Sequence, residues 1–312
     1  MMKIQITTSS YDLNNFIDSE LLNSAKIEIA LNPFKRRLTE SQVSDLLQDD
    51  VIGMIAGLEP LTESVLRDAP KLKLIVRCGA GLDSVDLVAA RKLGIDVVNT
   101  PNAPSRAVAE LTIGHMINIL RHISATDRSL REGSWTPTMG TLLGTKKVGL
   151  IGLGRIGKMV SDLLLAFGAS VQAFDPNVTS PNSLVTLCDL ETLLSTSDII
   201  SLHVPYSAET HHLLNAKTLC LMKSESVIVN VSRGGLIDED ALLHSLTSNL
   251  IAGAALDCFE NEPYTGPLRL LSNVCTTSHM GSYARETRDQ MEIEASTALV
   301  AGLKKHGFIP HP

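Results

Sequence analysis

The stretch V-G-L-I-G-L-G-R-I-G, residues 148–157, decides the fold class of this 312-residue chain. An apolar run enters the pattern Gly152-x-Gly154-x-x-Gly157, and an amphipathic helical pattern follows it. In such a strand–turn–helix setting the first glycine permits a tight turn, the second lets a pyrophosphate approach the backbone, and the third lets the helix pack on the strand. The amides at the helix N-terminus then meet the phosphate charge. The stretch therefore predicts a dinucleotide-binding unit.

Asp175 indicates which dinucleotide is bound. It ends the apolar run V-Q-A-F-D and lies 18 residues after Gly157. The motif predicts an acidic residue about 20 residues further on, whose carboxylate bonds the ribose hydroxyls and repels a 2′-phosphate. The three residues after Asp175 include no Arg or Lys, so NAD is favoured over NADP as the cofactor.

Short apolar runs alternate with helical patterns over most of the chain. This alternation predicts an α/β fold in which helices cover both faces of parallel sheets. Strands are expected at residues 3–7, 27–31, 51–55, 72–77, 95–98, 148–151, 171–174, 198–202, 226–231, 251–256 and 274–277. Helices are expected at residues 39–48, 84–93, 105–132, 155–167, 190–195, 239–248 and 283–305.

The helix expected at residues 105–132 is apolar on more than one side. This pattern is typical of a helix that bridges domains or subunits. Trp135, the only tryptophan, follows this helix. We expect it to be an interface or packing residue rather than a substrate contact.

Composition and charge exclude several classes of protein. The length suggests about two domains, and the net charge of −7 argues against a nucleic-acid or anionic-membrane partner. No run reaches the roughly 18 apolar residues of a membrane span, and the chain starts in a strand pattern rather than a signal peptide. The five cysteines lack C-x-x-C spacing, so we expect reduced thiols, no bound metal and a cytoplasmic location.

Polar side chains follow three of the expected strands. Arg233 stands in V-N-V-S-R-G-G, the residues Asp257, Glu260 and Glu262 stand in L-D-C-F-E-N-E-P, and His279 stands in T-T-S-H-M-G. Ligands of parallel α/β sheets bind outside the carboxyl ends of the strands. We therefore expect Arg233, Glu262 and His279 to converge on one crevice.

These residue types suit hydride transfer to and from a 2-hydroxy acid. A histidine can take up and return the hydroxyl proton, an adjacent carboxylate fixes the histidine tautomer, and an arginine offers paired donors to a substrate carboxylate. Each residue alone also fits a plain structural role: an ion pair for Arg233, a loop position for Glu262 and a strand-end contact for His279.

In these motifs the chain resembles the D-isomer-specific 2-hydroxyacid dehydrogenases, in particular the phosphoglycerate dehydrogenase-like branch. The resemblance runs from about residue 45 to the C-terminus. It rests on the glycine turn with Asp175, H-V-P at 203–205, N-V-S-R-G-G at 230–235, D-C-F-E-N-E-P at 257–263 and H-M-G at 279–281. It implies an NAD-dependent oxidoreductase acting on a small 2-hydroxy or 2-keto acid, with Arg233, Glu262 and His279 as catalytic residues.

The resemblance implies further contacts. Backbone amides of Ala80 and Gly81, in the turn R-C-G-A-G-L-D, would bind the substrate carboxylate together with Arg233. Asp257 would bind the nicotinamide carboxamide. The other cofactor contacts that it implies are Gly152, Gly154, Arg155, Ile156, Gly157, Asp175, His203, Val204, Pro205, Thr210, Val231, Ser232, His279 and Gly281.

The resemblance also implies the domain organisation. A Rossmann-type NAD-binding domain over residues 100–283 would be inserted into a flavodoxin-like substrate domain formed by residues 1–99 and 284–312. The helix at residues 105–130 would carry the contact of a homodimer.

Several points stay open. Two other functions occur on this fold: an NAD(H)-sensing, corepressor-like binding protein, and a phosphite or formate dehydrogenase. Lys35, Arg36 and Arg37 would suit a phosphate or second carboxylate on the substrate, or they form a solvated turn. Ser278 stands where the family usually has Pro, and Pro104 stands where many members have Asn.

Overall fold

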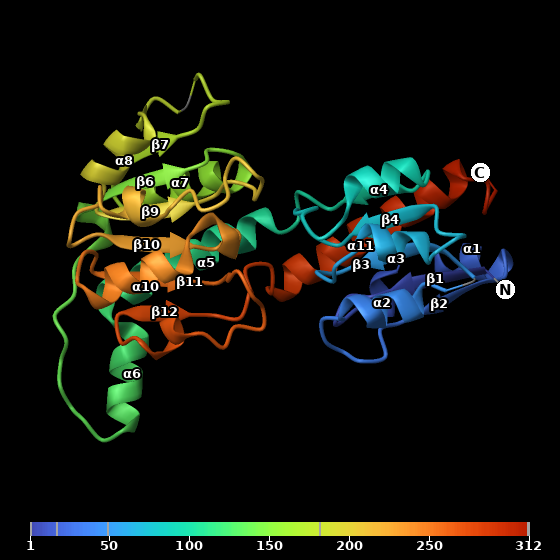
Figure 1. Ribbon diagram of the computed structural model, residues 1–312, viewed down its shortest axis with the longest axis horizontal. Coiled ribbons are helices and arrows are strands. Elements are labelled where there is room, and N and C mark those ends of the chain that lie inside the picture. The colour runs from blue at the N-terminus through green and yellow to red at the C-terminus, as the bar shows by residue number, and fades with distance from the viewer. Residues whose placement is uncertain (1, 17, 49, 181, 311–312) are drawn as a thin grey trace. The chain divides into compact units, whose positions relative to one another are not determined.

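The computed structural model describes residues 2–16, 18–48, 50–180 and 182–310. The chain forms two compact α/β units (Figure 1). Unit 1 comprises Met1–Pro104 and Ser282–Pro312, and unit 2 comprises Ser105–Gly281. Within the described ranges, every helix is too short or too polar to cross a bilayer.

Unit 1 is built on one parallel sheet in the order β2-β1-β3-β4-β5. Side chains of its central strands alternate between two apolar layers. Ile52 and Leu74 pack with α11, whereas Met54 and Ile75 pack with α2 and α3. The strands are β1 (Met2–Ile6), β2 (Ile27–Ala30), β3 (Val51–Ala56), β4 (Leu74–Arg77) and β5 (Asp96–Asn99). The helices are η1 (Leu13–Asn15), α1 (Ser19–Ser24), α2 (Glu40–Leu46), α3 (Glu63–Arg67), α4 (Leu87–Lys92) and α11 (Arg285–Lys305).

Unit 2 is built on a second parallel sheet, in the order β12-β11-β10-β9-β6-β7-β8. The chain order reverses between β6 and β9, which is the place where open α/β sheets bind ligands. The strands are β6 (Lys147–Ile151), β7 (Ser170–Phe174), β8 (Val185–Leu187), β9 (Ile199–Leu202), β10 (Val227–Asn230), β11 (Gly253–Leu256) and β12 (Val274–Thr276). The helices are α5 (Ser105–Arg121), α6 (Ile123–Arg131), η2 (Leu143–Thr145), α7 (Arg155–Ala166), α8 (Leu190–Thr196), α9 (Ala216–Leu219), η3 (Gly234–Leu236), α10 (Glu239–Thr247) and η4 (Pro267–Leu270).

Helices cover both faces of the sheet in unit 2. Apolar side chains of α5 and α7 pack on one face with Leu150 and Val229. Side chains of α8, α9 and α10 pack on the other face with Ile200 and Ile228. The two parallel sheets, each between two helical layers, confirm the predicted fold class.

The predicted strands are found with ends shifted by at most two residues. The three-residue strand β8 was not predicted, because its hydrogen bonds to β7 rather than its own short sequence stabilise it. The short helices α1, α3 and α9 were also missed, since they hold 6, 5 and 4 residues and show little periodicity.

The prediction of one continuous helix over residues 105–132 was wrong. The backbone of His122 is left-handed, with φ of +56°, and separates α5 from α6. The side-chain oxygen of Asn118 accepts a hydrogen bond from the Ser124 amide at 2.8 Å, which supports the break. Of these two helices, α5 contributes buried side chains to the apolar core of unit 2, whereas α6 has no buried residue. In Figure 1, α6 extends away from the sheet of unit 2.

Candidate active site

The predicted site residues of unit 2 lie at one edge of its sheet. All of its strand pairs are parallel, so the loops that follow the strands leave from the same edge. These loops bring together side chains that are far apart in the sequence. The residues at the strand ends are Gly152 after β6, Asp175 after β7, His203 after β9, Arg233 after β10, Asp257 after β11 and His279 after β12.

The glycine turn after β6 has the geometry of a phosphate-binding turn. Gly152 has φ of +97°, and a Cβ there would lie 2.7 Å from the His203 carbonyl oxygen. A Cβ on Gly157 would lie 2.2 Å from the Gly152 oxygen, so both positions exclude larger residues. A Cβ on Gly154 would meet no described atom within 4 Å. Since Gly154 directly precedes α7, this open approach to the helix N-terminus fits a pyrophosphate.

Asp175 has a structural role that the sequence did not indicate. One carboxylate oxygen accepts a hydrogen bond from the Leu153 amide at 2.8 Å, and the other accepts one from the Asn177 amide at 2.9 Å. The half-buried carboxylate therefore ties the end of β7 to the glycine turn. Each oxygen keeps a second lone pair, so the predicted bond to the ribose hydroxyls is compatible with this arrangement.

Hydrogen bonds hold the segment that follows β9 in place. Ser201 Oγ lies 2.9 Å from His203 Nε2, and burial lowers the pKa of His203 to about 4, so its ring is neutral. The other ring nitrogen, Nδ1, is buried and has no hydrogen-bond partner among the described residues. Thr210 Oγ1 donates to the Pro205 carbonyl at 2.8 Å. Ser232 Oγ donates to the Val204 carbonyl at 2.6 Å, which joins this segment to the loop after β10.

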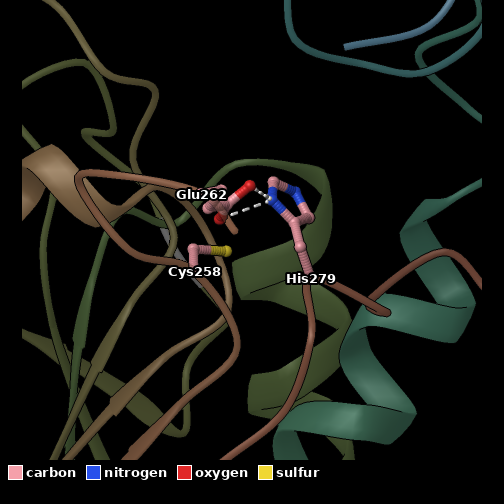
Figure 2. Close-up of side chains that lie close together, drawn as sticks. All are labelled: Cys258, Glu262 and His279. Carbon is pink, nitrogen blue, oxygen red and sulfur yellow. Dashed lines mark hydrogen bonds and ion pairs between the residues drawn. The ribbon is translucent and has the colours of Figure 1, made fainter. Parts of the chain in front are cut away.

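The residues predicted to transfer a proton form a pair. His279 Nδ1 lies 2.9 Å from both carboxylate oxygens of Glu262 (Figure 2). The Phe259 amide donates to the same carboxylate at 3.1 Å and so fixes its position. Because a carboxylate accepts, Nδ1 carries the proton, and in the neutral ring Nε2 is then the acceptor. The side chains of His279 and Glu262 are 24% and 17% exposed, so the pair is partly accessible.

Asp257 holds the loop that carries His279. Its fully buried carboxylate accepts hydrogen bonds from Thr277 Oγ1 at 2.6 Å and from the amides of Met280 and Gly281, both at 2.8 Å. Its backbone carbonyl accepts a bond from the His279 amide at 2.8 Å. These bonds stabilise His279 in a left-handed backbone conformation, with φ of +53°.

The bonds to Asp257 explain how the loop tolerates Ser278 at the position where the family usually has proline. Proline would restrict the backbone before His279, and Ser278 is exposed and does not do so. The bonds to Asp257 supply the restriction from within the loop. His115, on α5, extends the hydrogen-bond network of Asp257, since its Nε2 lies 3.1 Å from Thr277 Oγ1. Burial lowers the pKa of His115.

Ser232 links Arg233 to Cys258, whose sulfur lies beside the His279–Glu262 pair, called the dyad below. The Ser232 carbonyl accepts a hydrogen bond from Arg233 Nη1 at 2.7 Å and one from the Cys258 thiol at 3.3 Å. A Cβ on Gly234 would overlap the backbone of Phe259, so the loops after β10 and β11 are in direct contact. Sequence reasoning treated Cys258 as a packed thiol and missed its place beside Glu262 and His279. Its position next to Asp257 at a strand end was the available signal.

Other predicted residues have simple surroundings. Arg155 and Ile156 form the first turn of α7, and Val231 is buried in the core of unit 2. In unit 1, the Ala80 carbonyl accepts a hydrogen bond from Asn99 Nδ2 at 2.6 Å, and Ala80 itself is exposed. Gly81, next to it, is half-buried. Residues 35–37 are exposed, and the Arg36 guanidinium lies 5.4 Å from the centre of the Phe34 ring.

Known proteins resemble the chain over most of its length. The family model described as "D-isomer specific 2-hydroxyacid dehydrogenase, NAD binding domain" matches residues 113–281. A hydroxypyruvate reductase from Thermotoga maritima is 36% identical over 292 residues, which cover 90% of this chain and 94% of that protein. A D-3-phosphoglycerate dehydrogenase from Synechocystis sp. is 36% identical over 275 residues, which cover 86% of this chain but only 50% of that protein.

The fold also matches solved structures. A D-lactate dehydrogenase from Aquifex aeolicus, complexed with NAD and lactic acid, superposes with a TM-score of 0.83 at 27% identity. The superposition covers 97% of this chain and 96% of that one. The family model spans more than half of this chain, and the hydroxypyruvate reductase matches nearly all of it. The resemblance inferred from the motifs is therefore confirmed: the chain belongs to the D-isomer specific 2-hydroxyacid dehydrogenases, oxidoreductases that use NAD.

Proposed function

We propose that the chain reduces a small 2-keto acid to a D-2-hydroxy acid with NADH, and that hydroxypyruvate is the foremost substrate. The observation that carries the proposal is the His279–Glu262 pair, with Nδ1 at 2.9 Å from both carboxylate oxygens. Such a pair leaves Nε2 to donate a proton to the keto oxygen in reduction and to accept it back in oxidation.

Each site residue has a defined role in the proposed reaction. Bound NAD supplies the hydride acceptor or donor. Glu262 orients the His279 ring and stabilises the imidazolium. Arg233 binds the substrate carboxylate with a planar pair of donors, and the backbone amides of Ala80 and Gly81 are proposed to bind the same group. Asp257 positions the His279 loop and is proposed to accept the nicotinamide carboxamide through a remaining lone pair.

The cofactor contacts of unit 2 are also part of the proposal. Gly154 leaves an open approach to the N-terminus of α7 for the pyrophosphate. Asp175 is proposed to bind the ribose hydroxyls. The buried, unpartnered Nδ1 of His203, judged among the described residues, supports a ligand contact at the end of β9.

The names of the relatives support the choice of substrates to test. Hydroxypyruvate is placed first because the Thermotoga relative, 36% identical over 292 residues, is named hydroxypyruvate reductase, and 3-phosphohydroxypyruvate is the alternative because the Synechocystis relative is named D-3-phosphoglycerate dehydrogenase. Residues 35–37 stay candidates for a phosphate contact, because they are basic and exposed. Glyoxylate is the second substrate to test, since a 37% identical relative from Thermofilum pendens is named glyoxylate reductase.

The test is NADH oxidation with a panel of 2-keto acids: hydroxypyruvate, glyoxylate, pyruvate and 3-phosphohydroxypyruvate. Turnover of hydroxypyruvate with the highest kcat/KM, lost in His279→Gln, supports the proposal. A higher kcat/KM for 3-phosphohydroxypyruvate would reassign the substrate. NADH binding without turnover of any acid would favour the corepressor-like function instead.

We also propose a homodimer and a cytoplasmic location. The segment 123–142, which begins with α6, carries exposed apolar side chains along its length. Trp135 is 84% exposed and Met139 is 92% exposed, and Ile123, Leu130 and Leu142 are more than half exposed. Such a patch supports a subunit contact, and the exposure of Trp135 argues against packing within the chain. The five cysteines are reduced, which supports a reducing compartment. Light scattering after size exclusion tests the dimer, which Trp135→Ser is expected to weaken.

A further inference from the structure

A third reactive side chain lies beside the proton-transfer pair. The sulfur of Cys258, a carboxylate oxygen of Glu262 and a ring nitrogen of His279 all lie within 4.8 Å of one another. Cys258 and Glu262 come from the segment after β11, and His279 comes from the loop after β12. Figure 2 shows the thiol directed toward the carboxylate–imidazole pair. We call these three residues the thiol–dyad cluster.

We propose that the thiol–dyad cluster binds a borderline-soft divalent cation, with Zn²⁺ as the model ion, and that this cation reversibly inhibits the enzyme. The inhibitory part rests on the proposed function, because it requires His279 to transfer the proton. Binding of the cation itself does not depend on that role.

The donor set selects the kind of ion. A thiolate, an imidazole nitrogen and a carboxylate oxygen are the three ligand types of protein zinc sites, with bond lengths of about 2.0–2.3 Å. Mg²⁺ and Ca²⁺ prefer six or more oxygen ligands, and the cluster offers a single carboxylate. Thiolate also strengthens the preference for softer ions. We therefore expect Zn²⁺ and Cd²⁺ to bind and Mg²⁺ to have no effect.

The present distances are close to those of a metal site. Tetrahedral ligands around zinc lie about 3.3–3.6 Å apart, as follows from the bond lengths. The His279 and Glu262 ligand atoms are now 2.9 Å apart, and no pair in the cluster exceeds 4.8 Å. Movements of about 1 Å along side-chain torsions therefore complete the triangle. A water molecule would take the fourth position, as in open zinc sites.

The surroundings already orient two of the ligands. The Phe259 amide holds the Glu262 carboxylate at 3.1 Å, and the Asp257 carbonyl holds the His279 backbone at 2.8 Å. Partners of this kind strengthen metal sites by fixing the ligands. Cys258 is only 3% exposed, so the ion would approach from the accessible side of the imidazole and carboxylate.

Metal binding would stop proton transfer. Coordination by Nδ1 shifts the imidazole proton to Nε2, and coordination by Cys258 releases the thiol proton to solvent. The metal-bound imidazole then carries N–H at Nε2 and cannot accept the hydroxyl proton in oxidation. In reduction, donation of the Nε2 proton would leave an imidazolate rather than a neutral ring, because the imidazolium that Glu262 stabilises no longer forms. The reaction would be inhibited in both directions without loss of NADH binding.

The first test is inhibition of NADH-dependent reduction by Zn²⁺ in a buffer without thiols or chelators. We expect Zn²⁺ to inhibit, EDTA to restore activity and Mg²⁺ to have no effect. Cys258→Ala and Cys258→Ser should raise the inhibition constant at least about tenfold, because lost outer partners alone weaken metal sites by about 10–100-fold. The matched control is Cys220→Ala, which removes the exposed thiol and should leave inhibition unchanged. Inhibition is measured against each variant's own rate without metal, because the Cys258 thiol also donates a hydrogen bond to the Ser232 carbonyl.

The second test does not require turnover. Co²⁺ titrated into the purified chain should produce a thiolate-to-cobalt charge-transfer band that Cys258→Ala removes and Cys220→Ala retains. The band without 2-keto acid reduction would uphold the cation site and reject the proposed function. Equal Zn²⁺ sensitivity of Cys258→Ala and the parent chain, or a cobalt–thiolate band that survives Cys258→Ala, would overturn the proposal.

Discussion

Replacement of Asp257 by Asn should loosen the His279 loop without changing the shape of the side chain. Three donors face the Asp257 carboxylate, namely Thr277 Oγ1 and the amides of Met280 and Gly281. Asparagine replaces one of the two oxygens by an NH₂ group. The amide orientation that keeps the oxygen toward Thr277 and Met280 preserves two of the three bonds. The NH₂ group then faces the buried Gly281 amide, and since both groups are donors, that bond cannot form.

The size of the effect follows from this geometry. A hydrogen bond to a charged group contributes about 1.5–3 kcal/mol and one between neutral groups about 1 kcal/mol. The bond from the Gly281 amide is lost, and the bonds from Thr277 and Met280 now reach a neutral oxygen instead of a charged one. Removal of the buried negative charge offsets part of this loss. We expect the free energy of unfolding to fall by about 3 kcal/mol. At about 2–4 °C per kcal/mol for a domain of this size, Tm falls by about 6–12 °C.

Catalysis should also respond, because the three bonds to the Asp257 carboxylate hold the loop that carries His279. A misplacement of about 1 Å in a catalytic group costs roughly 10²-fold, so kcat should fall by at least about tenfold. The assays are thermal unfolding followed by circular dichroism and NADH oxidation with the preferred 2-keto acid. Asp162→Asn, on the exposed side of α7, is the control for loss of one negative charge. A Tm and kcat equal to those of the control would refute the anchoring role.

Three further predictions concern the proposed roles. His279→Gln should lower kcat by about 10²–10⁴-fold, because the proton donor is lost, while NADH fluorescence titration shows nearly unchanged binding; near-normal kcat would remove His279 from the mechanism. Arg233→Lys should raise KM for the keto acid and lower kcat, since lysine lacks the planar pair of donors; unchanged kcat/KM in steady-state kinetics would make Arg233 structural. Asp175→Ala should weaken NADH binding by about 1.5–3 kcal/mol for the lost charge-assisted bond and narrow the preference over NADPH; equal use of NADPH by the parent chain would contradict the assignment of Asp175 to the ribose.

The elements of the fold could be predicted because their signals are local. Apolar runs of strand length, the helical patterns between them and the glycine turn at 152–157 depend on residues near in sequence. Among the elements that were missed, β8 is stabilised by its hydrogen bonds to β7. The helices α1, α3 and α9 have 6, 5 and 4 residues, which are too few to show a helical period. The break at His122 was missed because it depends on a single side-chain bond from Asn118 and does not interrupt the apolar pattern.

The candidate site also combines features that the local sequence predicts with features that depend on tertiary packing. From the sequence alone came the chemical types at the strand ends, Arg233, Glu262 and His279, because parallel strands deliver their following loops to one edge of the sheet. Only the tertiary structure decided what those loops do to one another. It placed the Cys258 sulfur within 4.8 Å of the dyad and aimed three donors at Asp257. Such contacts join loops after different strands, and their geometry depends on the packing of the whole sheet rather than on spacing along the chain.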